Sequence, residues 1–292
     1  MTAFLEYAQR GRNTWWRYLC SAILALVIAM VVGLAIAAAL VLSHLTPPDL
    51  AAQVTHPTRP AIFFIATGIS FACLLAGFAL AIRLLHGKRF TDLLGDWRWR
   101  AVAAGGAVWF AIEALAAFAD FGIAPRTFQL TASSRTLALL LTAAPALAIQ
   151  TFTEEFVFRG YVTQGLLLAI RKPWLAAIGS GLIFGAVHVP NGWPQAVNAT
   201  LFGIATAYIA IETGSIAFTF GIHLVNNLFG AVLVVSGSDV FRGAPGLFTQ
   251  NAAQLMWLDV VVQGFMIVLV AVLMAARRRG PRRPALTAAD HF

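Results

Sequence analysis

Long apolar runs, separated by short polar segments, alternate along most of this chain. A membrane-spanning helix needs ~20 consecutive, mainly apolar residues, so the pattern predicts an all-α polytopic bundle of about eight transmembrane helices. The segments between the runs contain prolines and glycines, which end helices. The predicted spans are Trp16–His44, Ala61–Leu85, Arg100–Ala119, Arg135–Ile170, Pro173–Val189, Gln195–Glu212, Ser215–Ser236 and Ala252–Ala276.

Composition supports a membrane protein and sets its orientation. The 292 residues are 60% hydrophobic and 11% charged, whereas soluble domains are about 25% charged. The net charge of +8 comes from basic residues that flank the apolar runs, which is typical of topology signals, so we expect a lipid bilayer and no nucleic acid as partner. Because most Lys and Arg fall on one side, both termini are predicted to be cytoplasmic, in the plasma or inner membrane. Cys20 and Cys73 lie in apolar runs and predict no disulfide framework.

We interpret the chain as one integral membrane domain, residues 1–292. Within it, residues 1–134 hold the first three, peripheral spans, and residues 135–236 hold the core helices with the candidate chemistry. Residues 237–292 hold the last span and a basic tail. The fourth predicted span is too long for the membrane, since ~36 helical residues extend ~54 Å against a hydrocarbon core of ~30 Å. It must therefore either tilt and protrude into the cytoplasm, or break near its pair of glutamates.

Those charged residues form the sequence Thr-Phe-Thr-Glu-Glu-Phe-Val-Phe-Arg-Gly, from Thr151 to Gly160. On a helix, Glu155 and Arg159 are four residues apart, so they can form an ion pair. Glu154 points in another direction and has no local cation in the sequence. Ionisable groups at membrane depth are costly and usually functional, and a carboxylate in such a place is a candidate general base.

Two further polar motifs follow on later spans. His188 ends the motif Phe184-x-x-x-His188, and His223 begins the motif His223-x-x-x-Asn227. Counted from the Arg171-Lys172 turn, Glu154 and His188 reach similar depths in an antiparallel hairpin. The chemistry that suits these groups is the activation of water: Glu154 removes its proton, His188 orients the water or shares its proton, and His223 and Asn227 donate hydrogen bonds to the oxyanion that forms.

The three motifs Glu-Glu-x-x-x-Arg, Phe-x-x-x-His and His-x-x-x-Asn, in this order on successive spans, resemble the CPBP intramembrane proteases. This family includes CAAX prenyl proteases and bacteriocin-processing enzymes, also called Abi-type proteins. The resemblance covers about Arg135 to Ser236. It implies a glutamate-type endopeptidase that cleaves a membrane-associated peptide or a prenylated protein. It implies the catalytic residues Glu154, His188, His223 and Asn227 and the supporting residues Glu155, Arg159, Phe184 and Asn226.

Three alternatives remain open from the sequence. The first is a zinc site formed by His188, His223 and Glu154, although no metal or other cofactor is expected and the chain has no His-Glu-x-x-His motif. The second is a transporter, which would favour repeated halves that the sequence lacks. The third is a non-catalytic immunity or adaptor protein. Glu113 and Asp259 lie outside the motifs and are interpreted as interhelical hydrogen-bond partners.

Overall fold

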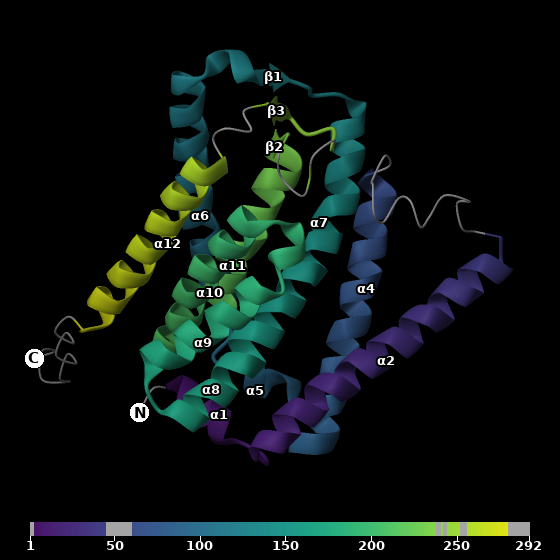
Figure 1. Ribbon diagram of the computed structural model, residues 1–292, viewed down its shortest axis with the longest axis vertical. Helices are drawn as coiled ribbons and strands as arrows, with labels where there is room; N and C mark the ends of the chain where they lie inside the picture. The colour runs from purple at the N-terminus through teal and green to yellow at the C-terminus, as the bar shows by residue number, and fades with distance from the viewer. Residues whose placement is uncertain (1–2, 45–59, 238–240, 242–243, 252–255, 280–292) are drawn as a thin grey trace, which may run out of the picture.

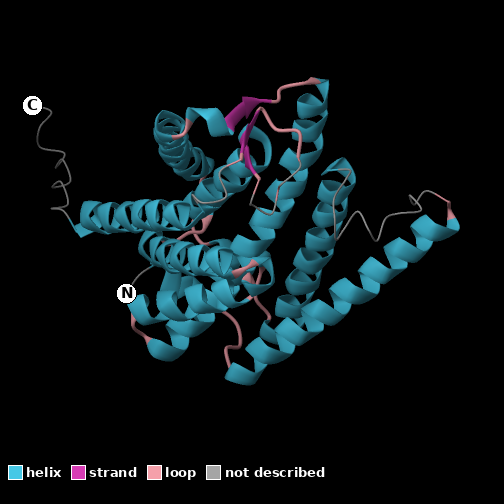
Figure 2. Cartoon of the chain, turned by 45° about the horizontal axis from the view of Figure 1, so that its top comes forward, coloured by secondary structure: helices cyan, strands magenta, loops and turns pink. Residues whose placement is uncertain are grey.

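The computed structural model describes residues 3–44, 60–237, 241, 244–251 and 256–279. Within these residues the chain is a bundle of helices with one small sheet (Figure 2). The last part of the predicted basic tail, residues 280–292, lies outside the described residues, as does the start of the predicted last span at residues 252–255. The all-α, polytopic prediction is confirmed.

The helices are connected mostly by short turns. They are α1 (Ala3–Gln9), α2 (Trp15–Leu42), α4 (Pro60–Ala81), α5 (Phe90–Leu94), α6 (Trp99–Ile123), α7 (Ser134–Glu154), α8 (Thr163–Ile170), α9 (Pro173–Ala186), α10 (Trp193–Thr213), α11 (Ala217–Leu228) and α12 (Met256–Arg279). The π-helical segments η1 (Ile82–His86), η3 (Glu155–Val162) and η5 (Phe229–Leu233) continue α4, α7 and α11, and the 3₁₀ turns are η2 (Pro125–Thr127) and η4 (Val189–Asn191). The strands are β1 (Phe128–Leu130), β2 (Val234–Ser236) and β3 (Phe248–Gln250).

Six helices among the described residues are long and apolar enough to cross a membrane, and each coincides with a predicted span. They are Trp15–Leu42, Ala61–His86, Trp99–Ile123, Ser134–Ile170, Trp193–Thr213 and Trp257–Ala276. The other two predicted spans correspond to shorter apolar helices, Pro173–Ala186 and Ala217–Leu233. Their predicted bounds were too wide, because the chain turns after Ala186 and becomes a strand at Val234.

The fourth predicted span remains one helical run of 37 residues, from Ser134 to Ile170. It does not break at the glutamates, but its hydrogen-bonding pattern becomes π-helical from Glu155 to Val162. The carbonyl oxygen of Phe158 in this segment accepts hydrogen bonds from the hydroxyls of Thr163 and Ser180, at 2.8 and 3.1 Å. π-helical turns inside α-helices are rare and are frequently found at functional sites.

Glycines allow two pairs of helices to approach closely in the core. On α6 and α11, a Cβ atom at Gly105 would lie 3.0 Å from the carbonyl carbon of Phe218, and one at Gly221 would lie 2.9 Å from that of Val102. On α9 and α10, a Cβ atom at Gly203 would lie 2.9 Å from the Cα atom of Gly181. Small residues at helix contacts are the usual device for close packing in membranes.

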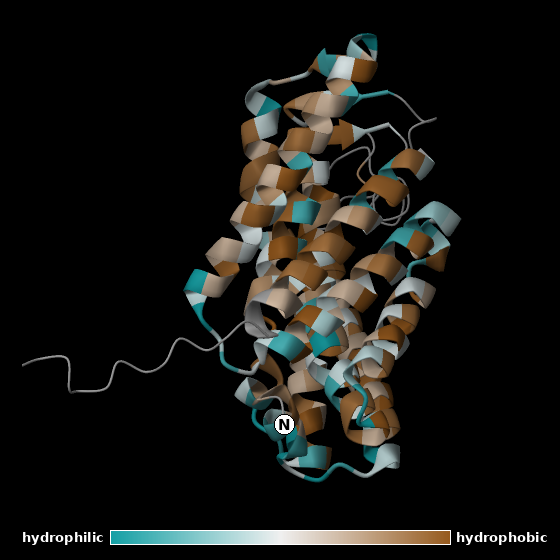
Figure 3. Ribbon diagram, turned by 90° about the vertical axis from the view of Figure 1, so that its left-hand side faces the viewer, coloured by the Kyte–Doolittle hydropathy of each residue, from teal (hydrophilic) through white to brown (hydrophobic). Residues whose placement is uncertain are grey.

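The two ends of the bundle differ in what they contain. The small sheet, in the order β1-β3-β2, lies at one end, and α1, α5 and the α8–α9 turn lie at the other (Figure 1). Apolar residues concentrate between these ends, and hydrophilic residues gather near them (Figure 3). Helix α2 packs along α4 and leans away from the remaining helices (Figure 1). Neither α1 nor the three-residue strands were predicted, since all are too short to produce a periodic pattern.

Candidate active site

The ion pair predicted from helical spacing is present and completely buried. Arg159 Nη1 lies 3.2 Å from Glu155 Oε1, and both side chains have no exposed surface. The guanidinium also donates from Nε and Nη2 to the hydroxyl of Thr206 on α10, at 2.9 and 2.7 Å. The ring of Phe184 lies against its other side, with the guanidinium carbon 4.2 Å from the ring centre. Because each of these contacts limits the movement of Arg159, the guanidinium holds Glu155 in one position.

His223 on α11 lies between the two glutamates. Its Nδ1–H donates to Glu155 Oε1 at 2.9 Å, while its Nε2 lies 3.4 Å from Glu154 Oε2. An ionised carboxylate can only accept, so the bond to Glu155 fixes the proton on Nδ1 and turns Nε2 toward Glu154. The sequence left Glu154 without a charged neighbour; the structure places His223 and Gln150 beside it, the latter donating to Glu154 Oε1 at 3.2 Å.

His188 reaches the same region from the turn that follows α9. It was predicted within a helix, but α9 ends at Ala186 and His188 immediately precedes the 3₁₀ turn Val189–Asn191. Its Nδ1–H donates to the carbonyl oxygen of Phe184 at 2.7 Å. In the neutral ring this leaves Nε2 as an acceptor. Phe184, the first residue of the same motif, is buried, and its ring lies edge-on to His223.

A row of hydrogen bonds runs from α6 through α11 to α7. Trp109 Nε1–H donates to Asn226 Oδ1 at 3.1 Å, and Asn226 Nδ2–H donates to Asn227 Oδ1 at 3.2 Å. Asn227 Nδ2–H then donates to the hydroxyl of Thr151 at 3.2 Å. Thr151 lies about one turn before Glu154, so the nitrogen end of the Asn227 amide is directed at the helix that holds the glutamate pair.

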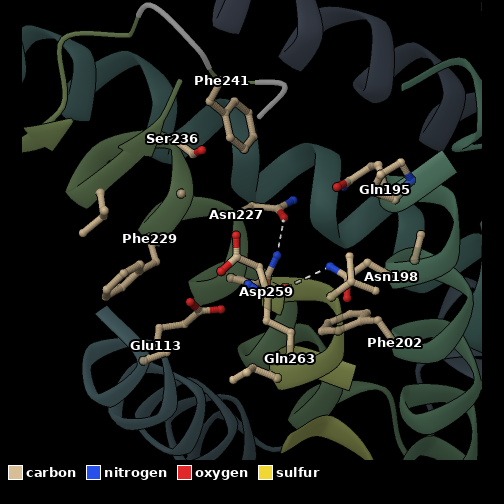
Figure 4. Close-up of a pocket in the computed structure, with 18 of the residues that line it drawn as sticks. Glu113, Gln195, Asn198, Phe202, Asn227, Phe229, Ser236, Phe241, Asp259 and Gln263 are labelled. Atoms are coloured by element: carbon tan, nitrogen blue, oxygen red, sulfur yellow. Dashed lines mark hydrogen bonds between the residues drawn. The ribbon is translucent and has the colours of Figure 1, made fainter. Parts of the chain in front are cut away.

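A cavity of about 630 Å³ brings these groups together. Its walls include Glu154, His188, His223 and Asn227, whereas Glu155 and Arg159 are packed behind the wall. Glu113 on α6 and Asp259 on α12 face the same cavity, and Asn198 donates to Gln263 across it at 2.8 Å (Figure 4). Among the described residues that line it there is neither Lys nor Arg. The cavity therefore presents acceptors and titratable groups within an apolar bundle.

Comparison with known proteins agrees with the motifs. Residues 135–229 match the family described as Type II CAAX prenyl endopeptidase Rce1-like. This match supports the resemblance of the motifs to the CPBP family of CAAX proteases. The Rce1-like segment begins in the first turn of α7 and ends at Phe229, so it contains all three motifs. With the apolar helices around it, the segment makes this chain an integral membrane protein with a domain of an intramembrane protease family.

A second comparison gives a relative that is similar to this chain over most of its length. The protein is 25% identical over 272 residues to the Uncharacterized protein YyaK of Bacillus subtilis (strain 168), covering 88% of this chain and 90% of the relative. No solved structure matches the chain significantly. Helices α6 and α12 lie outside the Rce1-like segment, yet both contribute walls to its cavity.

For the zinc alternative, the structure gives only the arrangement of the three expected ligands. No three His, Cys, Asp or Glu side chains in the described part of the chain are grouped as ligands for a metal ion. His188, His223 and Glu154, the ligands expected for zinc, share the cavity wall, but His223 directs its two ring nitrogens at two different glutamates.

Sequence reasoning missed three residues that shape the site. Thr206 and Thr151 accept hydrogen bonds from Arg159 and Asn227, and Trp109 donates to Asn226. Threonines and tryptophans are common in apolar helices, so nothing in their spacing distinguishes these three from packing residues. Asn226, which the resemblance implied as a supporting residue, joins α11 to α6 through its bond to Trp109. Glu113 and Asp259 both face the cavity that contains the motif residues.

Proposed function

We propose that this protein is a glutamate-dependent intramembrane endopeptidase that cleaves a membrane-associated peptide or protein with Glu154 as the general base. The contact of Glu154 with His223 at the wall of a shared cavity carries the proposal. The Rce1-like match supports the peptidase class. Both termini in the cytoplasm of a cell membrane remain part of the proposal, supported by the uneven distribution of Lys and Arg.

The reaction follows from the proton positions. A water molecule in the cavity gives a proton to the Glu154 carboxylate, and the resulting hydroxide adds to the carbonyl carbon of the scissile peptide bond. His188 Nε2 accepts the remaining proton of the water as a hydrogen bond and aligns it. The oxyanion accepts from an N–H of Asn227. Protonated Glu154 then returns its proton to the leaving nitrogen, and the carbon–nitrogen bond breaks.

Glu155 and Arg159 have a different role in this proposal. Both are fully buried behind the cavity wall, so neither reaches a substrate. Glu155 holds the Nδ1 proton of His223, and Arg159 neutralises Glu155. The ring of His223 thereby stays in one orientation, with Nε2 directed at Glu154 at the cavity wall.

The proposal is tested with purified protein in liposomes and membrane-anchored peptides, one set farnesylated near its C-terminus and one set unmodified. Cleavage products are identified by mass spectrometry. Glu154→Gln should lower the rate by at least about 10²-fold, the typical contribution of a general base. Glu6→Gln, at an exposed position on α1, is the matched control and should cleave normally.

The possible outcomes of this assay distinguish the candidate functions. Undiminished cleavage by Glu154→Gln contradicts Glu154 as the base. Activity that disappears with a chelator and returns with zinc contradicts the metal-independent mechanism. Wild-type protein that cleaves neither peptide set contradicts the peptidase assignment and favours a non-catalytic adaptor. Preference between the two peptide sets would identify whether a prenyl group is recognised.

A further inference from the structure

A buried tryptophan outside the Rce1-like segment reaches the polar face of α11. Trp109 on α6 has an exposed fraction of 0% and belongs to the largest fully buried side chains of the described residues. Its ring packs at the edge of Phe202, with ring centres 5.8 Å apart. The indole N–H needs an acceptor in this apolar surrounding. It finds one in the side chain of Asn226, next to the motif residue Asn227.

The indole determines the orientation of two amides. An amide oxygen only accepts and an amide nitrogen only donates. Because Trp109 occupies Asn226 Oδ1, the Nδ2 end of Asn226 faces Asn227 and donates to its oxygen. That bond holds the oxygen of Asn227 on the side of Asn226. The nitrogen of Asn227 is therefore directed at Thr151 and the glutamate pair, as its bond to Thr151 shows.

The packing of α6 on α11 makes this contact possible. Gly105 lies one turn before Trp109 and has no side chain to separate it from the backbone of Phe218. Gly221, two residues before His223, meets the backbone of α6 in the same way. Hence the indole stands close enough to α11 to bond to a side chain as short as asparagine.

We infer that Trp109 is a positioning residue for the hydrolytic reaction, which acts through Asn226 to present the N–H end of Asn227 to the oxyanion. This inference rests on the proposed function. It also means that α6 belongs to the active site, so the segment matched to the family, residues 135–229, does not contain the complete catalytic arrangement.

The kinetic test separates the donor from the packing of the ring. Trp109→Phe removes the N–H and some volume, while replacement by 3-benzothienylalanine keeps the shape and removes only the N–H. Both should lower kcat by about 10–100-fold with KM changed less than about twofold, since the loss concerns a group that acts on the transition state. Trp97→Phe, at a half-buried tryptophan away from the cavity, controls for the substitution itself.

A double-substitution cycle tests the route through Asn226. If the indole acts only through that amide, Trp109→Phe should lower kcat no further in an Asn226→Ala background. If the two substitutions lower kcat by factors that multiply in the double variant, Trp109 does not act through Asn226. A normal kcat in the 3-benzothienylalanine protein would overturn the role of the N–H, whatever its thermal stability.

A measurement that does not depend on catalysis tests this inference separately from the proposed function. In protein with ¹⁵N-labelled asparagine, the side-chain amide signals of Asn226 and Asn227 should exchange with water faster, or broaden, when Trp109 becomes Phe. Unchanged amide signals would overturn the inference. Altered amide signals in a protein whose wild type cleaves no peptide would support the orientation of the amides and contradict the peptidase function.

Discussion

Replacing Gly105 by alanine inserts a methyl group where α6 and α11 approach closely. The new Cβ atom would lie 3.0 Å from the carbonyl carbon of Phe218 and 3.3 Å from the backbone nitrogen of Ile222. The carbonyl oxygen of Phe218 lies closer still. Since non-bonded heavy atoms in favourable contact are ~3.5–4.0 Å apart, the two helices must separate by more than about 1 Å. Such overpacking costs about 1–3 kcal/mol, and the higher helix propensity of alanine offsets up to ~1 kcal/mol of it.

The same separation draws Trp109 away from Asn226. A misplacement of about 1 Å at a catalytic group can lower a rate by 10²-fold, so we expect Gly105→Ala to reduce kcat by about 10–100-fold and stability by about 0–2 kcal/mol. Thermal unfolding in detergent and peptide cleavage in liposomes measure the two effects. The control is Gly122→Ala on the same helix, where no heavy atom lies within 4 Å of the added Cβ. If both variants behave alike, the close approach of α6 and α11 does not position the site.

Two further substitutions test the charges of the chain. Glu155→Gln should lower the free energy of unfolding by about 3–5 kcal/mol, because it leaves the buried guanidinium of Arg159 without its carboxylate; a variant as stable as Glu154→Gln in the same denaturation assay would refute this. Burial lowers the pKa of Lys88 from its ordinary value of 10.5 to about 8, so the unfolded chain binds more protons between these values. The free energy of unfolding should therefore rise from pH 8 to 10.5 by up to about 3 kcal/mol, and Lys88→Met should abolish the rise. If the free energies of unfolding of the wild type and of Lys88→Met change with pH in parallel, this prediction is wrong.

The fold was predictable where the apolar pattern is long, and less so where elements are short. Six predicted spans coincide with long helices because ~20 apolar residues have few alternatives in a membrane. The end of α9 was misjudged because Val187, His188 and Val189 continue the apolar pattern, while Pro190 and Gly192 already impose a turn. The strands depend on pairing between segments far apart in the chain, such as Phe128 with Gln250, which local patterns do not contain.

In the candidate site, too, some contacts were predictable from the sequence and others were not. Spacing alone was sufficient for the pair of Glu155 and Arg159, because four helical residues bring both side chains to one face. The contact of His223 with both glutamates was not predictable from spacing, since it depends on the relative height of α7 and α11. Trp109 and Thr206 escaped notice because their hydrogen bonds cross between helices, and the sequence distance gives no measure of that proximity.

The π-helical segment Glu155–Val162 makes this region sensitive to chain length. Deleting one residue there would favour ordinary helical hydrogen bonding, whose turns hold fewer residues, and would change the angle between Glu154 and the helix after the deletion. The side chains of Thr163 and Gln164, which now bond to Ser180 and to the backbone of Asp92, would turn away from both partners. Insertions and deletions are therefore expected to be excluded from this turn, even where single substitutions are accepted.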